Sequence, residues 1–282
     1  SSAASDVYKR QTLIIEKLKM TDYFIAIVMS VIQGLTEFLP ISSSAHLLIP
    51  SLLFGITDLG LNFDIAVHFG TLTAVVFYFR DDIVKIFNSF YNIKDVNLAS
   101  YRKLGLFVLI ASIPAIIIGP FFSDALINRQ VTIHSIAISN LIFANLLLAA
   151  YLLSKQKLSM QQLTYLSAFL IGCFQIFAFF PGASRSGVLI TGALILGFNL
   201  KDGSKFAFLL AIPAISGALI FMVLGFDQNV NLNEILILIL GFLISAFVAF
   251  FTIEFFLRFV NKIGMYPFIF YRFVLGLILI ML

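Results

Sequence analysis

Long apolar runs dominate this sequence and limit the folds that it can adopt. Six of them are long enough to cross a bilayer as helices, because a span needs about 20 apolar residues. They cover roughly residues 63–79, 104–122, 132–153, 206–225, 235–257 and 265–282. Only 11% of the 282 residues are charged, whereas a soluble domain carries about 25%. We therefore expect an all-α polytopic membrane protein.

Two further apolar regions, at about 23–55 and 163–199, are interrupted in the middle. Pro40 and the serines after it break the first, and Pro181-Gly182 breaks the second. Each half has about 12–17 residues, which is shorter than the bilayer requires, and proline removes a backbone donor. Irregular backbone at membrane depth is tolerated only where it lines a cavity or is buried in protein. We predict two re-entrant helical hairpins beside six transmembrane helices.

The basic residues of the loops favour this topology, because cytoplasmic loops are enriched in Lys and Arg. Five such residues lie between positions 80 and 103, which places that loop in the cytoplasm. If the second hairpin returns to its own side, the basic loops at 154–162, 201–205 and 258–262 are cytoplasmic as well. The loop 226–234, which has no Lys or Arg, then lies outside. Lys17 and Lys19 are the exception to this scheme.

The two interrupted regions share a short pattern. Phe38-Leu-Pro40-Ile-Ser-Ser43 aligns with Phe179-Phe-Pro181-Gly-Ala-Ser184 at an offset of 141, and three spans follow each. On the charge scheme the hairpins enter from opposite sides, which is an inverted-topology repeat. We expect one membrane domain at 22–282, with repeats at about 22–153 and 163–282. Residues 1–21 are a polar tail, and the sequence leaves open whether it is native or expression-derived.

The first break carries side chains of a catalytic type. A lone glutamate inside a bilayer is costly, so function is the default interpretation of Glu37. Gln33 lies one helical turn earlier on the same face, and a helix-packing hydrogen bond explains it equally well. We expect a re-entrant turn to bring His46 back beside Glu37. Ser43 is the candidate nucleophile because it aligns with Ser184, and Ser42 is expected to cap the following helix.

The second break predicts an anion site. Arg185 cannot lose its proton and needs an anionic partner or water at that depth. It lies where a short helix begins, and a helix N-terminus offers amide donors and partial positive charge. Gly182 allows close approach of the backbone, and Ser184 and Ser186 add hydroxyls. We predict a phosphate cradle, with a structural Arg185–Glu37 pair as the alternative.

Other polar residues of the spans have simpler explanations. Asp64 and His68 are four residues apart and are expected to form a pair on a helix surface. Asn140 is expected to join two helices, and Arg272 to add positive field near the outer mouth.

The remaining composition excludes two classes of function. One cysteine, Cys173, cannot build a Cys-based zinc cluster or an intramolecular disulfide. The net charge of +4 is spread over the loops, which indicates membrane orientation and no nucleic-acid partner.

The stretches QGLTEFLPISSSAH at 33–46 and PGASRSG at 181–187 resemble two signatures of the bacterial undecaprenyl-pyrophosphate phosphatases, the bacitracin-resistance family. The first signature is (E/Q)xxxE with a downstream Ser and His, and the second is PGxSRSxxT, with Thr191 taken as its threonine. The resemblance extends from about Asp22 and includes IGCFQ, FLLAIPA at 208–214 and PFIFYRF at 267–273. Gln33 stands at a position where the signature allows either Glu or Gln.

This resemblance implies an integral membrane hydrolase of the bacterial inner (plasma) membrane, with a site that opens to the extracytoplasmic side. Its substrate would be a polyprenyl pyrophosphate lipid, whose tail lies among membrane lipid, and the product is the carrier for cell-wall synthesis. The implied catalytic residues are Glu37, Ser43, His46 and Arg185, with Ser43 as nucleophile or as the group that orients water. The implied substrate-binding residues are Gln33, Ser42, Gly182, Ser184, Ser186 and Thr191. Glu37 would be the base or the ligand of Mg²⁺, or of another divalent cation such as Ca²⁺.

The alternative is a transporter or flippase of the polyprenyl phosphate carrier. Inverted repeats with broken helices are typical of secondary transporters. Such a protein would use Arg185 and the helix N-termini in the same way, without a need for Ser43 or His46. The sequence leaves open whether the protein is a homodimer.

Overall fold

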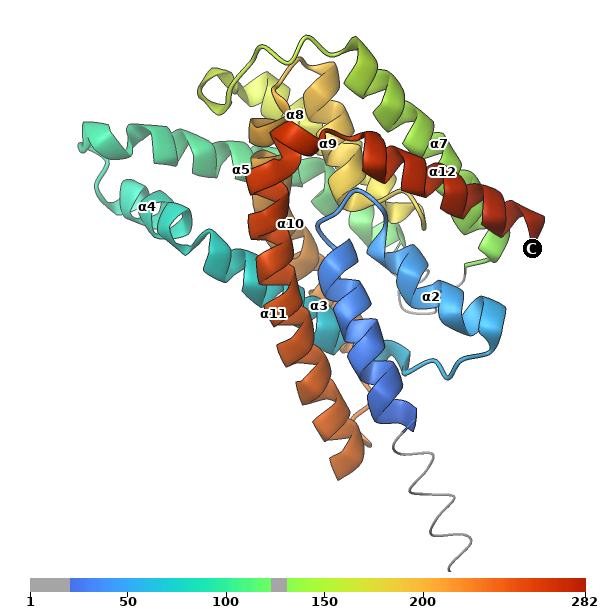
Figure 1. Cartoon of the computed structure of the whole chain (residues 1–282). Helices are drawn as coiled ribbons and strands as arrows, with labels where there is room; N and C mark the ends of the chain where they lie inside the picture. The colour runs from blue at the N-terminus through green and yellow to red at the C-terminus, as the bar shows by residue number, and fades with distance from the viewer. Residues whose placement is uncertain (1–20, 123–130) are drawn as a thin grey trace, which may run out of the picture.

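The computed structural model describes residues 21–122 and 131–282, in which all regular elements are helices apart from a bridge between Leu158 and Phe198 (Figure 1). The tail therefore lies almost entirely outside the described residues. The α-helices are Thr21–Thr36, α2 (Ser43–Phe54), α3 (Gly60–Tyr78), α4 (Arg80–Tyr91), α5 (Ala99–Ile118), α7 (Ile133–Leu153), α8 (Tyr165–Gln175), α9 (Arg185–Ile195), α10 (Leu200–Leu224), α11 (Leu232–Ile263) and α12 (Tyr266–Met281). Short 3₁₀ helices are η1 (Val96–Leu98), η2 (Gly119–Phe122), η3 (Met160–Gln162) and η4 (Ile176–Phe179).

Five helical segments of the described chain are long and apolar enough to cross a membrane: Gly60–Tyr78, Val96–Phe122, Ile133–Leu153, Leu200–Leu224 and Leu232–Ile263. They correspond to five of the six expected spans and confirm a multi-pass membrane protein. The sixth, α12, has 16 residues, which at 1.5 Å per residue covers about 24 Å, less than the roughly 30 Å of the hydrocarbon core.

The two predicted interruptions are present. The helix Thr21–Thr36 ends before Glu37, and α2 starts at Ser43. In the second region α8 and η4 end at Phe179, and α9 starts at Arg185. Figure 1 shows Thr21–Thr36 and α2 both running downward from the loop that joins them, and α8 contacts α9.

The register of the two breaks differs by one residue from the alignment of the prolines. The residues before α2 and α9, Ser42 and Ser184, have matching left-handed backbones, with φ of 74° and 70°. This geometry pairs the helix starts at an offset of 142. Ser43 therefore corresponds to Arg185, and the prediction that it matches Ser184 is wrong, because the helix start and not the proline sets the local backbone.

The serines that flank each helix start repeat this correspondence. Ser42 Oγ lies 3.2 Å from Ser44 Oγ, and Ser184 Oγ lies 3.2 Å from Ser186 Oγ. The two breaks thus share backbone and side-chain geometry.

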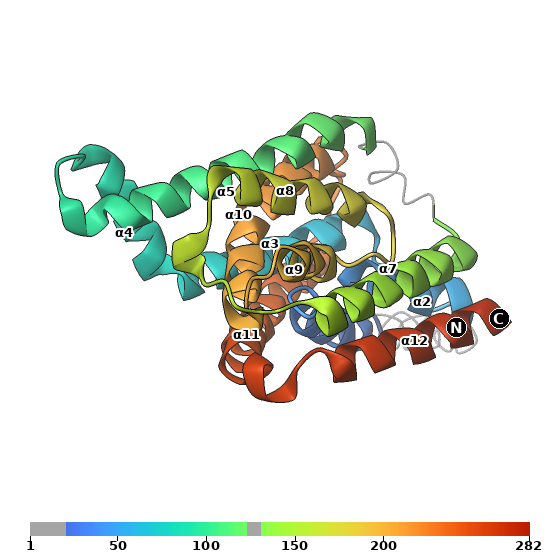
Figure 2. The same ribbon diagram turned by 90° about the horizontal axis from the view of Figure 1, so that it is seen from above.

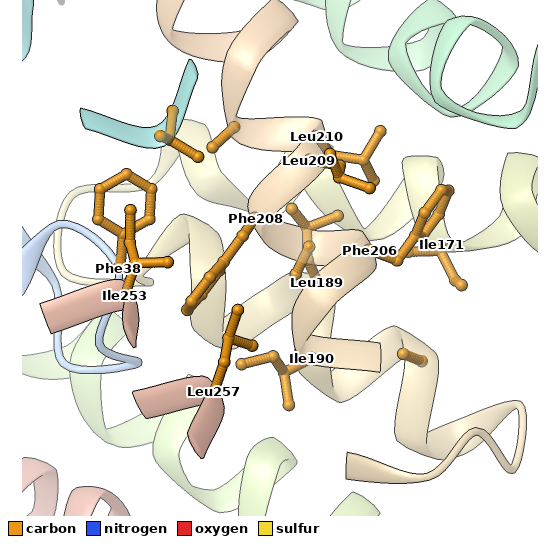
Figure 3. Packing of buried hydrophobic residues seen from close by; sticks show 14 of the residues in the cluster. Phe38, Ile171, Leu189, Ile190, Phe206, Phe208, Leu209, Leu210, Ile253 and Leu257 are labelled. Atoms are coloured by element: carbon orange, nitrogen blue, oxygen red, sulfur yellow. The ribbon is translucent and has the colours of Figure 1, made fainter. Parts of the chain in front are cut away.

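The hydrophobic core surrounds α9 and α10. Every residue of α9 from Ser186 to Leu194 is buried, as expected for a helix that is enclosed on all sides, and Figure 2 shows α9 in the middle of the bundle. In Figure 3, Phe38 of the first break points toward Phe208 of α10, with ring centroids 5.3 Å apart. The core therefore holds both breaks at the centre of the molecule.

Candidate active site

Glu37 is the point at which the two breaks meet. Its carboxylate is 8% exposed, and Oε2 accepts hydrogen bonds from Gln33 Nε2 at 2.9 Å and from Ser43 Oγ at 2.5 Å. Oε1 accepts from Arg185 Nη2 at 3.2 Å. Gln33 reaches Glu37 because it lies one helical turn earlier. These partners compensate the burial of a charge.

Arg185 combines an ion pair with unused donors. Its side chain is 14% exposed, and its guanidinium carbon lies 5.9 Å from the centre of the Phe38 ring. Among the described residues, its Nε and Nη1 are buried without a hydrogen-bond partner. A buried unsatisfied donor costs about 1–3 kcal/mol. The predicted pair with Glu37 is present, and it leaves donors on two nitrogens available for an anion.

His68, on α3, is also part of this site, whereas we expected it to pair with Asp64 on a helix surface. Its Nε2 lies 3.9 Å from Glu37 Oε2. Its Nδ1 lies 2.7 Å from the backbone oxygen of Asp64. The predicted contact between Asp64 and His68 is therefore present through the backbone of Asp64. The available signal was an imidazole in an apolar span, which favours a functional role.

His46 forms its hydrogen bonds with Ser42 and Tyr271. Its Nδ1 lies 2.6 Å from the backbone oxygen of Ser42, and its Nε2 lies 2.5 Å from Tyr271 Oη of α12. Because α2 begins at Ser43, His46 is one helical turn into α2, and its ring is directed toward α12.

The serines of the breaks mainly connect the loops. Ser184 caps α9 by accepting a hydrogen bond from the Gly187 amide at 3.2 Å. Ser186, which is 2% exposed, donates to the backbone oxygen of Leu39 at 2.9 Å. Ser42 is at the N-cap position of α2, but its side chain makes no capping hydrogen bond. The prediction that Ser42 caps α2 is therefore wrong. Ser184, at the equivalent position before α9, does cap its helix.

Thr191 forms a hydrogen bond within α9. Its hydroxyl donates to the Gly187 carbonyl at 2.7 Å, and the residue is 3% exposed. The spacing PGxSRSxxT places the threonine at position 189, where this chain has Leu189. The assignment of Thr191 to that signature is therefore wrong.

Arg272 is a buried residue that connects the two breaks. It is fully buried, and its donors reach oxygens of two loops and of α7: Asn140 Oδ1 at 2.8 Å, Asn140 O at 3.2 Å, Gly182 O and Ala183 O at 3.0 Å each, and Pro40 O at 3.5 Å. Asn140 Nδ2 donates in return to the Arg272 carbonyl at 2.7 Å. Asn140 thus joins α7 and α12, as predicted, and Arg272 holds both breaks together.

The side chains of the site could bind a metal ion only together with oxygen atoms of a bound substrate. Within residues 21–122 and 131–282, no three His, Cys, Asp or Glu side chains converge. Glu37 is the carboxylate of the site, and Mg²⁺ commonly binds one or two carboxylates plus substrate phosphate oxygens.

Comparison with known proteins shows the family of this chain. The family model "Bacitracin resistance protein BacA" matches residues 26–278. The undecaprenyl-diphosphatase of Alcanivorax borkumensis is 42% identical over 261 residues, which cover 92% of this chain and 98% of that protein. That of Saccharophagus degradans is 41% identical over 257 residues, which cover 90% and 96%. The chain belongs to the BacA bacitracin resistance family.

Proposed function

We propose that this protein is an integral membrane phosphatase that hydrolyses undecaprenyl pyrophosphate to undecaprenyl phosphate and inorganic phosphate. The observation that carries the proposal is Arg185, whose Nε and Nη1 are buried without partners among residues 21–122 and 131–282, beside the Glu37–Ser43 pair. A diphosphate would satisfy these donors, because guanidinium and phosphate geometries match. The names of the relatives support the same substrate.

Ser43 is the proposed nucleophile and Glu37 its base. The Ser43 hydroxyl already donates to Glu37 Oε2 at 2.5 Å, within the reach that a general base needs. Ser43 Oγ attacks the terminal phosphorus, its proton passes to Glu37, and the bond from that phosphorus to the bridging oxygen breaks. The lipid monophosphate leaves, and water then cleaves the phosphoserine. If Ser43 instead orients an attacking water, no phosphorylated Ser43 can be trapped.

The remaining residues supply charge and proton transfer. Phosphoryl transfer depends mainly on positioning and on electrostatic stabilisation, which is the role of Arg185. Gly182, Ser184 and Ser186 shape the loop that would meet the diphosphate. His46 lies one helical turn after Ser43, on the same face of α2, and serves as general acid or base for the phosphate groups.

A divalent cation fits this scheme at Glu37. Mg²⁺ or Ca²⁺ would be held by Glu37 together with diphosphate oxygens, and when bound it neutralises phosphate charge. Ser43 is held in place by its hydrogen bond to Glu37.

The proposed topology is an inverted repeat in the bacterial inner membrane, with the site open to the extracytoplasmic side. The matched backbones of Ser42 and Ser184 support the repeat, and the basic residues of the loop 80–103 support the sidedness. Cysteine labelling tests the sidedness: a cysteine introduced at Lys94, which is exposed, should react only from the cytoplasmic face. Reaction from outside would reverse the topology.

The function is tested by phosphate release from undecaprenyl or farnesyl pyrophosphate by detergent-purified protein, with and without Mg²⁺. Arg185→Ala should reduce kcat by about 10³-fold or more, as expected for loss of a guanidinium at a transferring phosphoryl group. Arg258→Ala is the matched control, because the Arg258 side chain is 69% exposed on α11. The absence of release by folded wild-type protein would refute the phosphatase.

The matched breaks also favour the second candidate, a flippase of the lipid monophosphate. Ser43→Ala separates the two functions. Loss of phosphate release with retained lipid binding supports the enzyme, whereas transport that continues without any phosphate release in the wild type supports the flippase.

A further inference from the structure

Both ring nitrogens of His46 have hydrogen-bond partners, and these partners determine which nitrogen carries the hydrogen. Nδ1 lies 2.6 Å from the backbone oxygen of Ser42, and a carbonyl can only accept, so Nδ1 carries the hydrogen. Nε2 of the neutral ring then has a free lone pair. The Tyr271 hydroxyl, 2.5 Å from Nε2, is therefore the donor of the second hydrogen bond.

Tyr271 is held in place by more than this hydrogen bond. Its ring stacks on the His46 ring, with centroids 5.6 Å apart and an interplanar angle of 15°. The next residue, Arg272, is fully buried and donates to the carbonyls of Gly182 and Ala183 in the second break. The turn of α12 that carries Tyr271 is thus fixed to the loop that precedes Arg185. Sites on rigid elements hold their side chains more accurately than sites on loops.

We propose that Tyr271 is a positioning residue of this phosphatase, which keeps His46 in the Nδ1–H tautomer and fixes the direction of Nε2 through the hydrogen bond from its hydroxyl. The inference rests on the proposed function, and it adds a residue from α12 that neither sequence signature contains. Tyr271 is 40% exposed, so its hydroxyl and the His46 ring that it contacts lie near the surface of the bundle. A histidine tautomer is commonly set by the hydrogen bond of its other nitrogen, and here the two bonds act together.

The test compares Tyr271→Phe with Tyr266→Phe. The first variant keeps the stacked ring and removes the donor. The second is a matched control on the same helix: Tyr266 is 54% exposed, its ring packs against Tyr151, and its hydroxyl makes no hydrogen bond to the described residues. General acid–base catalysis contributes about 10²–10⁴-fold, and imperfect positioning should lose part of it. We therefore expect Tyr271→Phe to lower kcat by roughly tenfold and leave KM within about twofold, while Tyr266→Phe stays at the wild-type values.

The second readout is ¹⁵N NMR of histidine-labelled protein, in which the His46 signals are assigned with His46→Asn. Wild type should show a protonated Nδ1 and an Nε2 that accepts a hydrogen bond, and Tyr271→Phe should shift the Nε2 resonance toward that of a free imine nitrogen. An unchanged kcat or an unchanged Nε2 resonance in Tyr271→Phe would overturn the inference. A fall in thermal stability that accompanies the loss of kcat would also overturn it, because Tyr271 would then be structural. If wild type releases no phosphate, the proposed function and this inference fail together; if it does, an unaffected Tyr271→Phe refutes the inference alone.

Discussion

Replacing Arg272 by methionine is the most direct test of how the two breaks are held together. Methionine fills much of the same space and removes every donor of the guanidinium. Three oxygens then lose a short hydrogen bond: Asn140 Oδ1 at 2.8 Å, and the carbonyls of Gly182 and Ala183 at 3.0 Å each. The longer contacts with the Asn140 carbonyl, at 3.2 Å, and with the Pro40 carbonyl, at 3.5 Å, are lost as well.

The size of the effect follows from these oxygens. Each buried acceptor that is left unpaired costs about 1–3 kcal/mol. The low end of that range applies because methionine also removes a desolvated charge, which is itself unfavourable to bury. Three acceptors then give a loss of about 3 kcal/mol in the free energy of unfolding. A large domain loses roughly 2–4 °C in Tm per kcal/mol, so Arg272→Met should lower Tm by about 6–12 °C.

The assay is thermal unfolding of purified protein in one detergent at a fixed concentration. Arg258→Met is the control, because its guanidinium is on the surface of α11 and 69% exposed, and its Tm should stay close to that of wild type. Arg272→Lys separates charge from geometry, since an ammonium cannot reach all the acceptors of a planar fork, and we expect an intermediate Tm. A Tm for Arg272→Met within about 2 °C of wild type would show that these hydrogen bonds contribute little net stability.

Two further substitutions test the base and the helix packing. Glu37→Gln keeps the shape of the side chain that accepts from Ser43 and should lower kcat for phosphate release by about 10²–10⁴-fold; a kcat near the wild-type value would remove Glu37 from the role of base. Gly172→Ala places a Cβ against the carbonyl of Ala111, where α8 contacts α5, and should reduce the free energy of unfolding by about 1–3 kcal/mol. Gly217→Ala is its control, because a Cβ there meets nothing within 4 Å, and it should be neutral or slightly stabilising.

The membrane fold could be predicted from local sequence. Apolar runs identify spans because the bilayer fixes their length, and five of the expected spans are present. The two breaks lie at Pro40 and at Pro181-Gly182 as predicted, since proline disrupts a helix through its own ring. The predicted pairing of Arg185 with Glu37 is present, and the phosphate cradle at the second break stays a prediction.

The partners of the site residues could not be predicted in the same way. His46 binds Tyr271, 225 positions later, and Arg272 binds carbonyls of both breaks. The one-residue shift in register, which pairs Ser43 with Arg185, depends on backbone angles that no proline spacing reveals.

The sequence by itself determined that this chain lies in a membrane, where its helices break, and which polar residues must be accounted for there. These properties are local, because they depend on the transfer of each segment into lipid and on the backbone chemistry of single residues. Only the tertiary structure decided that His68 faces Glu37, that His46 contacts α12, and that Arg272 is fully buried with hydrogen bonds to both breaks. Those outcomes depend on how distant helices pack and which buried polar groups they bring together, which is a property of the whole bundle.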